Sequence, residues 1–122
     1  MTNQLQGEIL FAGWTGDTAS AYVYTPWMPV RGDVATFGVE VVQNSGVSLD
    51  WNVETRTLES PTATSVFSTA PSAITGVGTY SATSSGTLPA TQLVRYRFKT
   101  GTPDVSKYVV LRALQPSWQA NR

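Results

Sequence analysis

The sequence contains neither histidine nor cysteine among its 122 residues. Because it has no histidine, the chain lacks the side chain used most often as a general base and as a metal ligand. Without cysteine, disulfides and thiol chemistry are excluded. The glycine-rich segment Gly76-Val77-Gly78 lacks the third glycine and the following helix of a nucleotide-binding loop. We therefore expect no catalytic residues, no cofactor and no metal site, and predict that the protein is not an enzyme.

Two carboxylates, Asp50 and Glu54, lie four residues apart on one predicted strand and so on the same face. At about 3.3 Å per residue they are roughly 13 Å apart. Paired catalytic carboxylates of inverting glycosidases are closer, at about 6.5–9.5 Å. We interpret Glu54, like Glu40, as a surface charge paired with an arginine on a neighbouring strand, and the candidates are Arg56, Arg95 and Arg112.

Charge is scarce as well. Charged residues make up 13% of the chain, against roughly 25% in typical domains. The eight basic and eight acidic residues give a net charge of zero. The chain therefore lacks the excess of positive charge that is typical of nucleic-acid-binding proteins. Residues 60–94 carry no charge. A polar but uncharged surface loses little when it is desolvated, so this composition suits a protein that is packed against a partner.

Long apolar runs are also missing. None approaches the roughly 20 residues that a membrane-spanning helix needs, so no membrane partner is expected. Residues 1–6 lack the basic and apolar regions of a signal peptide, and the chain is expected to be made in the cytoplasm of its host. We expect residues 1–6 and 119–122 to be loose or partner-bound tails.

Strand patterns are the clearest feature that is present. Residues 94–99 alternate between apolar and basic side chains, and residues 108–114 are nearly all apolar, as in a half-buried and a fully buried strand. We predict that they form a central antiparallel hairpin. Residues 34–43 and 47–57 predict a second hairpin, closed by a turn at 44–46, with Trp51 in the core.

Shorter strands are predicted at 8–12, which Gly13 ends, and at 19–25, 65–68 and 79–83. No helical period of useful length is found. With turn signals every 8–12 residues or so, about eight strands are expected. The fold class is therefore all-β: one domain over residues 1–122, an antiparallel β-sandwich or jelly-roll-like fold.

Aromatic residues are concentrated near the N-terminus, where Trp14, Tyr22, Tyr24 and Trp27 fall within fourteen residues. Prolines bracket Trp27-Met28, which excludes a central strand there. Exposed aromatics can anchor a protein interface or stack on sugars. For Trp14 and Trp27 two interpretations stay open, a cap on the core or a contact surface, and Trp118 is expected to fold back onto the body. The candidate partner-binding residues are Trp14, Tyr24, Trp27, Met28 and Trp118.

In general character the chain resembles the small all-β accessory proteins of tailed-phage virions, especially head decoration (cement) proteins. The features shared are the small Ser/Thr/Gly-rich β domain, the absence of Cys and His, and the apolar tail Leu114-Gln115-Pro116-Ser117-Trp118. The resemblance implies a virion location, the major capsid protein or another virion protein as partner, and a homo-oligomer, with a trimer favoured. The alternative is a carbohydrate-binding or receptor-binding module that uses exposed Trp and Tyr, so a glycan is a possible partner.

Overall fold

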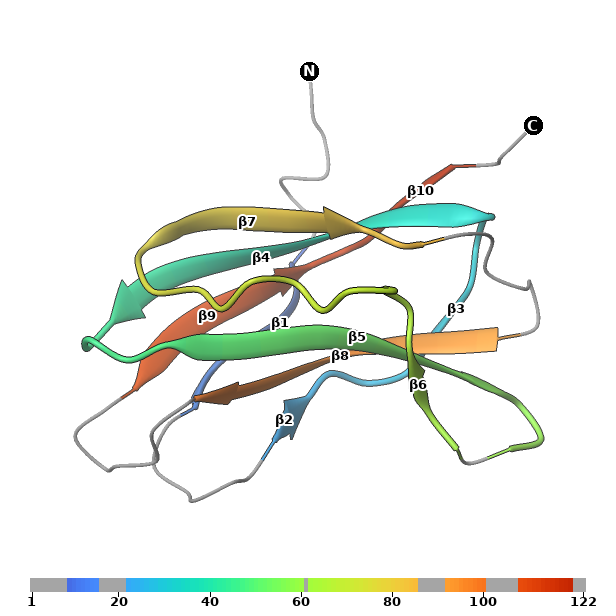
Figure 1. Cartoon of the computed structure of the whole chain (residues 1–122), viewed down its shortest axis with the longest axis horizontal. Coiled ribbons are helices and arrows are strands. Elements are labelled where there is room, and N and C mark those ends of the chain that lie inside the picture. The colour runs from blue at the N-terminus through green and yellow to red at the C-terminus, as the bar shows by residue number, and fades with distance from the viewer. Residues whose placement is uncertain (1–8, 16–21, 61, 86–91, 101–107, 120–122) are drawn as a thin grey trace.

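The computed structural model describes residues 9–15, 22–60, 62–85, 92–100 and 108–119, and these form ten β-strands and no helix. The strands make two five-stranded antiparallel sheets (Figure 1). The first sheet contains β1 (Ile9–Thr15), β4 (Val34–Asn44), β7 (Gly78–Thr83), β9 (Val109–Leu114) and β10 (Ser117–Gln119). The second contains β2 (Val23–Tyr24), β3 (Met28–Pro29), β5 (Leu49–Thr57), β6 (Thr64–Ser65) and β8 (Gln92–Thr100). The all-β sandwich prediction is confirmed, and within the described ranges no helix has the length and hydrophobicity to cross a membrane.

Two of the strand positions are interrupted. β2 and β3 both pair with β8, on the side that β5 does not occupy. β9 and β10 both pair with β4, on the side away from β7, and Pro116 lies between them. Counting each interrupted strand once reduces the ten strands to eight positions, the number expected from the turn spacing.

The pairing of these strands is nested. β1 pairs with β9, the pair β2/β3 with β8, β4 with β7, and β5 with β6. Each early strand thus lies beside a late one, as in a long hairpin. Further pairing of β4 with β9 and of β5 with β8 completes the two sheets.

Both predicted hairpins are wrong in their pairing, although their strands exist. β8 and β9 lie in different sheets, and so do β4 and β5. The predicted turn at 44–46 does form: Asn44 Oδ1 accepts from the amides of Gly46 (2.8 Å) and Val47 (2.9 Å), and Gly46 has a φ of 102°. It connects the two sheets across one end of the core. Alternation identifies the buried face of a strand, but in a sandwich both sheets bury their inner faces in the same core.

Strand boundaries differ most at the ends of the chain. β1 continues through Gly13 and Trp14, because both pair with β9. Of the strand predicted at 65–68, only Ser65 lies in a strand, β6. Gln119, predicted to be in a tail, pairs with Val34 in β10. The remaining residues of both predicted tails lie outside the described ranges, as do residues 19–21 of a predicted strand.

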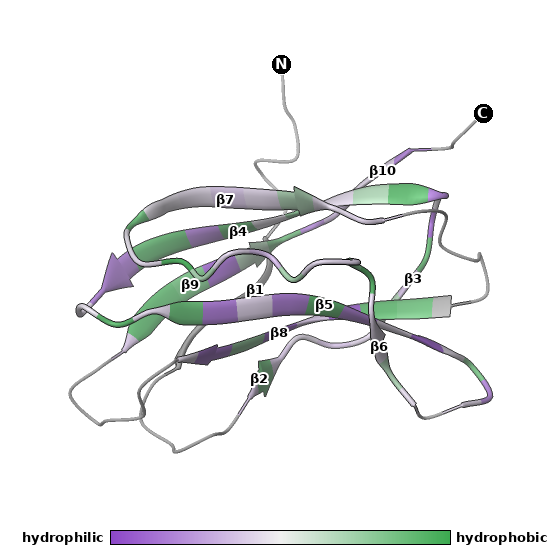
Figure 2. Cartoon of the chain, in the orientation of Figure 1, coloured by the Kyte–Doolittle hydropathy of each residue, from purple (hydrophilic) through white to green (hydrophobic). Residues whose placement is uncertain are grey.

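The core lies between the sheets, and Trp51 is buried in it as predicted, with 5% of its surface exposed. Figure 2 shows the alternation of hydropathy along β4 and β5 that places one face of each strand inward. Phe37 on β4 packs edge-on against Phe67 and Tyr96, with ring centroids 6.0 and 5.7 Å away. Aromatic contacts of this kind join the two sheets.

Tyr96 also joins the sheets through its hydroxyl group. The hydroxyl donates to the carbonyl oxygen of Leu114 (2.7 Å) and accepts from the amide of Gly38 (3.0 Å). Gly38 lies between the part of β4 that pairs with β10 and the part that pairs with β9. The break at Pro116 therefore leaves this amide without a strand partner on that side, and the tyrosine of the opposite sheet replaces it. Burial raises the pKa of Tyr96 above its usual value.

Candidate functional site

The outer face of the second sheet carries two facing rows of polar side chains. On β8 the outward positions are Arg95, Arg97 and Lys99, because they alternate with the buried Val94, Tyr96 and Phe98. The residues directly opposite them on β5 are Glu54, Asn52 and Asp50, in that order. A row of cations thus faces a row of acids and one amide, as cross-strand charge pairing favours.

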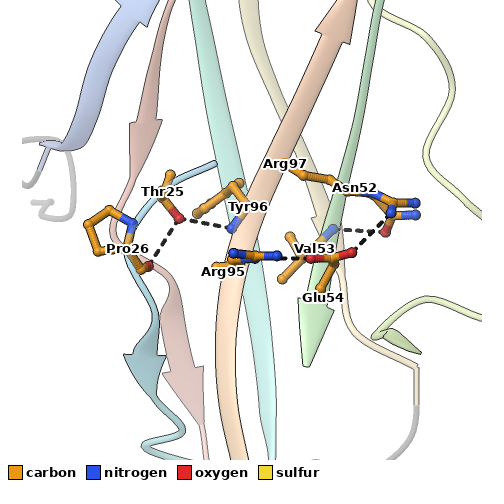
Figure 3. A network of polar contacts seen from close by, with 8 residues as sticks. All are labelled: Thr25, Pro26, Asn52, Val53, Glu54, Arg95, Tyr96 and Arg97. Atoms are coloured by element: carbon orange, nitrogen blue, oxygen red, sulfur yellow. Dashed lines mark hydrogen bonds and ion pairs between the residues drawn. The ribbon is translucent and has the colours of Figure 1, made fainter. Parts of the chain in front are cut away.

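Glu54 holds two of these arginines (Figure 3). Its Oε1 accepts from Arg95 Nε and its Oε2 accepts from Arg97 Nη1, each at 3.0 Å. The Glu54 side chain is only 10% exposed, so the guanidinium groups replace the water it has lost. The prediction that Glu54 and Glu40 each pair with an arginine of a neighbouring strand is confirmed, and the structure identifies the partners among the candidates. Glu54 pairs with Arg95, and Glu40 pairs with Arg112 at 3.1 Å in a more exposed position.

Strands β2 and β3, which both pair with β8, bring Tyr22, Tyr24 and Trp27 to the same face. Thr25, between β2 and β3, accepts the Tyr96 amide on its side-chain Oγ1 (3.0 Å) and donates its own amide to the Tyr96 carbonyl (3.2 Å). Figure 3 shows this side chain taking the place of a backbone acceptor. Thr25 is buried, and the flanking Tyr24 lies opposite Arg97 on the outward side. The prediction that the proline-bracketed segment is not a central strand is confirmed, because β3 pairs with β8 at the edge of the sheet in the described structure.

Cations and aromatic rings alternate along this edge. The guanidinium carbon of Arg95 lies 3.8 Å from the ring centroid of Tyr24 and 4.4 Å from that of Trp27. Arg56 lies 5.0 Å from Trp27. These are cation–π distances, below about 6 Å, at which ring and cation attract. Two cations lie over the neighbouring Tyr22: the Arg97 guanidinium carbon is 4.8 Å from its ring centroid and Lys99 Nζ is 5.0 Å from it. We call this surface the aromatic–cationic face: Tyr22, Tyr24, Trp27, Arg56, Arg95, Arg97 and Lys99.

The five predicted partner-binding residues do not come together. Tyr24 is 41% exposed and Trp27 is partly buried, and both belong to the aromatic–cationic face. Met28 pairs with Val94 and is buried in the core, so its prediction as a surface contact is wrong. Trp118 folds back as expected and packs edge-on against Phe37 at 6.2 Å. Trp14 lies in β1 opposite Val110, and its side chain is outside the described part of the structure.

Sequence reasoning missed Tyr22, Arg56 and Arg97 as members of one surface. Their outward positions followed from alternation, but their proximity depends on β2 and β3 lying next to β8. Sequence gave no signal for that pairing.

The side chains of this face offer a partner aromatic rings, cations and hydrogen-bonding groups. Each oxygen of Glu54 accepts a hydrogen bond from a guanidinium group, which fixes the position of this carboxylate on the face. Among the described residues, no three Asp or Glu side chains gather in a group that could hold a metal ion. The rings and cations are already held in place before any partner arrives, which lowers the entropy cost of binding.

Comparison with protein-family models, with curated proteins and with solved structures gave no match. The chain's own surfaces therefore carry the functional argument.

Proposed function

We propose that this domain is a structural protein of a virion, a decoration (cement) protein that binds a phage head lattice through protein–protein contacts. The nested strand pairing supports this proposal, because a jelly roll wound from one long hairpin would pair its early and late strands in this way. Jelly rolls are the domains of many viral capsids and of lectins. The partner would be the major capsid protein or another virion protein, and the working state a homo-oligomer, with a trimer favoured.

One observation carries the proposal: the exposed surface between residues 62 and 85 has no charge. Most residues in this segment are exposed, and all of the exposed ones are Ser, Thr, Ala or Val. Val77 is 64% exposed. Figure 2 shows the strand β7 and the segment leading to it mostly in pale colours and green. Burying such a surface in an interface removes no charge from water, and charge is the costly group to desolvate.

The edge strand β7 adds a docking feature to this surface. In the described structure it pairs with β4 alone, and it contains no proline and no charged residue. Monomeric proteins commonly protect an exposed edge with lysine, proline or a bulge. An unprotected edge in β7 suits a strand that pairs with another chain in an assembly.

The proposal is tested by adding the purified chain to heads of the encoding phage that lack it. We expect co-sedimentation with expanded heads and, by native mass spectrometry, a self-associated species whose mass is three times that of the chain. Several copies around a symmetry axis would turn weak contacts into stable binding. A chain that stays monomeric and neither binds nor stabilises heads would refute the proposal.

A Ser81→Lys variant locates the contact. Ser81 is an exposed residue of β7 opposite Gly38, so the free energy of unfolding should change by less than about 0.5 kcal/mol. Head binding should weaken about tenfold or more, because a lysine ammonium would be buried in the interface. The matched control is Gln43→Lys, which adds the same charge at an exposed site outside residues 62–85 and can still donate to Tyr108 Oη, as Gln43 does at 2.8 Å. Equal binding by the two variants would exclude β7 from the interface.

The second candidate function, carbohydrate or receptor binding through exposed Trp and Tyr, is favoured by Tyr22 and Tyr24. Both are more than a third exposed, and their ring centroids are 6.0 Å apart. Trp27 supports it less, because its side chain is partly buried, whereas Tyr22 and Tyr24 are exposed.

A further inference from the structure

An open pocket of about 170 Å³ lies at one side of the aromatic–cationic face. Strand β5 contributes Asp50 and Asn52, strand β8 contributes Arg97, and Tyr22 precedes β2. Ala70 and Pro71, in the uncharged segment that leads to β7, also line the pocket. Ligand pockets for drug-sized molecules have volumes of roughly 300–1,000 Å³, so this one suits a single small ring.

Two of its polar groups are fixed in advance. Asn52 is buried, and its Oδ1 accepts from the Val53 amide (2.8 Å) and from Ser65 Oγ (2.9 Å). That arrangement commits the amide oxygen and leaves the Asn52 amino group as the donor for a ligand. Arg97 is held by Glu54 at 3.0 Å, and its guanidinium carbon lies over the Tyr22 ring, 4.8 Å from the ring centroid. Fixed donors and acceptors bind with less loss of side-chain entropy than mobile ones.

The lining favours one class of ligand. Asp50 is an exposed carboxylate acceptor, Asn52 and Arg97 are donors, and Tyr22 with Pro71 offers apolar surface. Asp50 disfavours an anion, and Arg97 disfavours a cation. A neutral molecule with several hydroxyl groups and a C–H face satisfies all of these side chains, because hydroxyls donate to the carboxylate and accept from the donors.

We propose that this pocket binds one neutral pyranose ring of a glycan. This pocket would be the site of the carbohydrate-binding function considered above, and sugar binding there does not depend on head binding. The site uses Tyr22, and it uses neither Trp27 nor Met28, both of which the sequence had suggested.

The test is a ¹H–¹⁵N NMR titration of the full chain with free glucose, galactose, mannose and N-acetylglucosamine, each added separately. We expect at least one sugar to give saturable shifts at the Asn52 side-chain amide and at Ala70, with a dissociation constant in the millimolar range. Tyr22→Ala and Asp50→Asn should each weaken binding about tenfold, the equivalent of about 1.4 kcal/mol. Leu58→Ala truncates an exposed apolar side chain that does not line the pocket, and it should bind as the unaltered chain does.

Two outcomes overturn the proposal: no saturable shift with any of these sugars, or shifts that survive unchanged in both pocket variants. The readout is separate from head binding. A chain that binds sugar but no heads would refute the virion proposal alone, and the reverse result would refute the pocket alone.

Discussion

Replacing Tyr96 by phenylalanine is expected to lower the free energy of unfolding by about 2–4 kcal/mol, although it removes only one oxygen atom. The aromatic packing survives, because the ring still meets Phe37 at 5.7 Å and Phe98 at 5.8 Å. Two hydrogen bonds are lost, and the Gly38 amide and the Leu114 carbonyl lose this partner. An unpaired backbone group away from water costs more than the net value of a hydrogen bond, which is the reason for the large effect.

Urea denaturation of Tyr96→Phe measures this cost, and Tyr24→Phe is the matched control. Tyr24 is exposed, so loss of its hydroxyl should change stability by less than about 0.5 kcal/mol. If the two variants were equally stable, water or a rearranged Gln115–Pro116 segment would have to satisfy Gly38. The view that Tyr96 closes the gap between β9 and β10 would then be wrong.

The same tyrosine predicts how stability responds to alkaline pH. Burial raises the pKa of Tyr96 above its usual value of 10.0. Below pH 10 the phenol is protonated in the folded and the unfolded chain, and its contribution is fully present. Above pH 10 the unfolded chain ionises first, so the contribution falls as the pH rises toward the folded-state pKa. Tyr96→Phe should show a shallower loss of stability above pH 10 than the unaltered chain, measured by urea denaturation across that range.

Residues such as Trp51 and Phe98 show how far sequence alone can predict this fold. Each sits at an inward position of a period-2 pattern, and each is buried as expected. Pairing could not be predicted in the same way. β8 could have paired with β9 through a short loop, yet it pairs with β5 over nine residues. Local patterning fixes which side of a strand is apolar, while the choice of neighbour depends on the register of distant strands.

The candidate surface was predictable in part for the same reason. Arg95 and Glu54 were assigned outward positions and a cross-strand pairing, and they form an ion pair. The contact of Arg95 with Tyr24 and Trp27 was not predicted, because it requires the edge segment to lie beside β8 with Thr25 turned inward. The Thr25 hydroxyl replaces a backbone acceptor between two paired strands. One such substitution does not change the alternation of apolar and polar residues, so the sequence pattern does not reveal it.

Glu54→Gln is expected to be the second strongly destabilising change, at about 2–3 kcal/mol. A glutamine keeps one acceptor oxygen for one arginine but turns an NH₂ group toward the other, where two donors then face each other. Arg95 and Arg97 are 24% and 30% exposed, so water offsets part of the loss and the cost stays below the roughly 3–5 kcal/mol of a fully buried pair. Arg56 and Lys99 on the same face add repulsion that the carboxylate now balances.

Glu40→Gln is the control that the chain itself provides. Glu40 makes the same kind of ion pair with Arg112, also between neighbouring antiparallel strands, but the two side chains are 36% and 41% exposed. Exposed pairs contribute at most about 1 kcal/mol, so the two substitutions should differ by at least about 1 kcal/mol in urea denaturation. Added salt should narrow the difference between Glu54→Gln and the unaltered chain, because screening weakens the repulsion among the remaining cations. If the two variants proved equally stable, Glu54 would be no more than a surface charge. The aromatic–cationic face would then have to be held by its rings, and the order that Arg97 brings to the pocket would need another source.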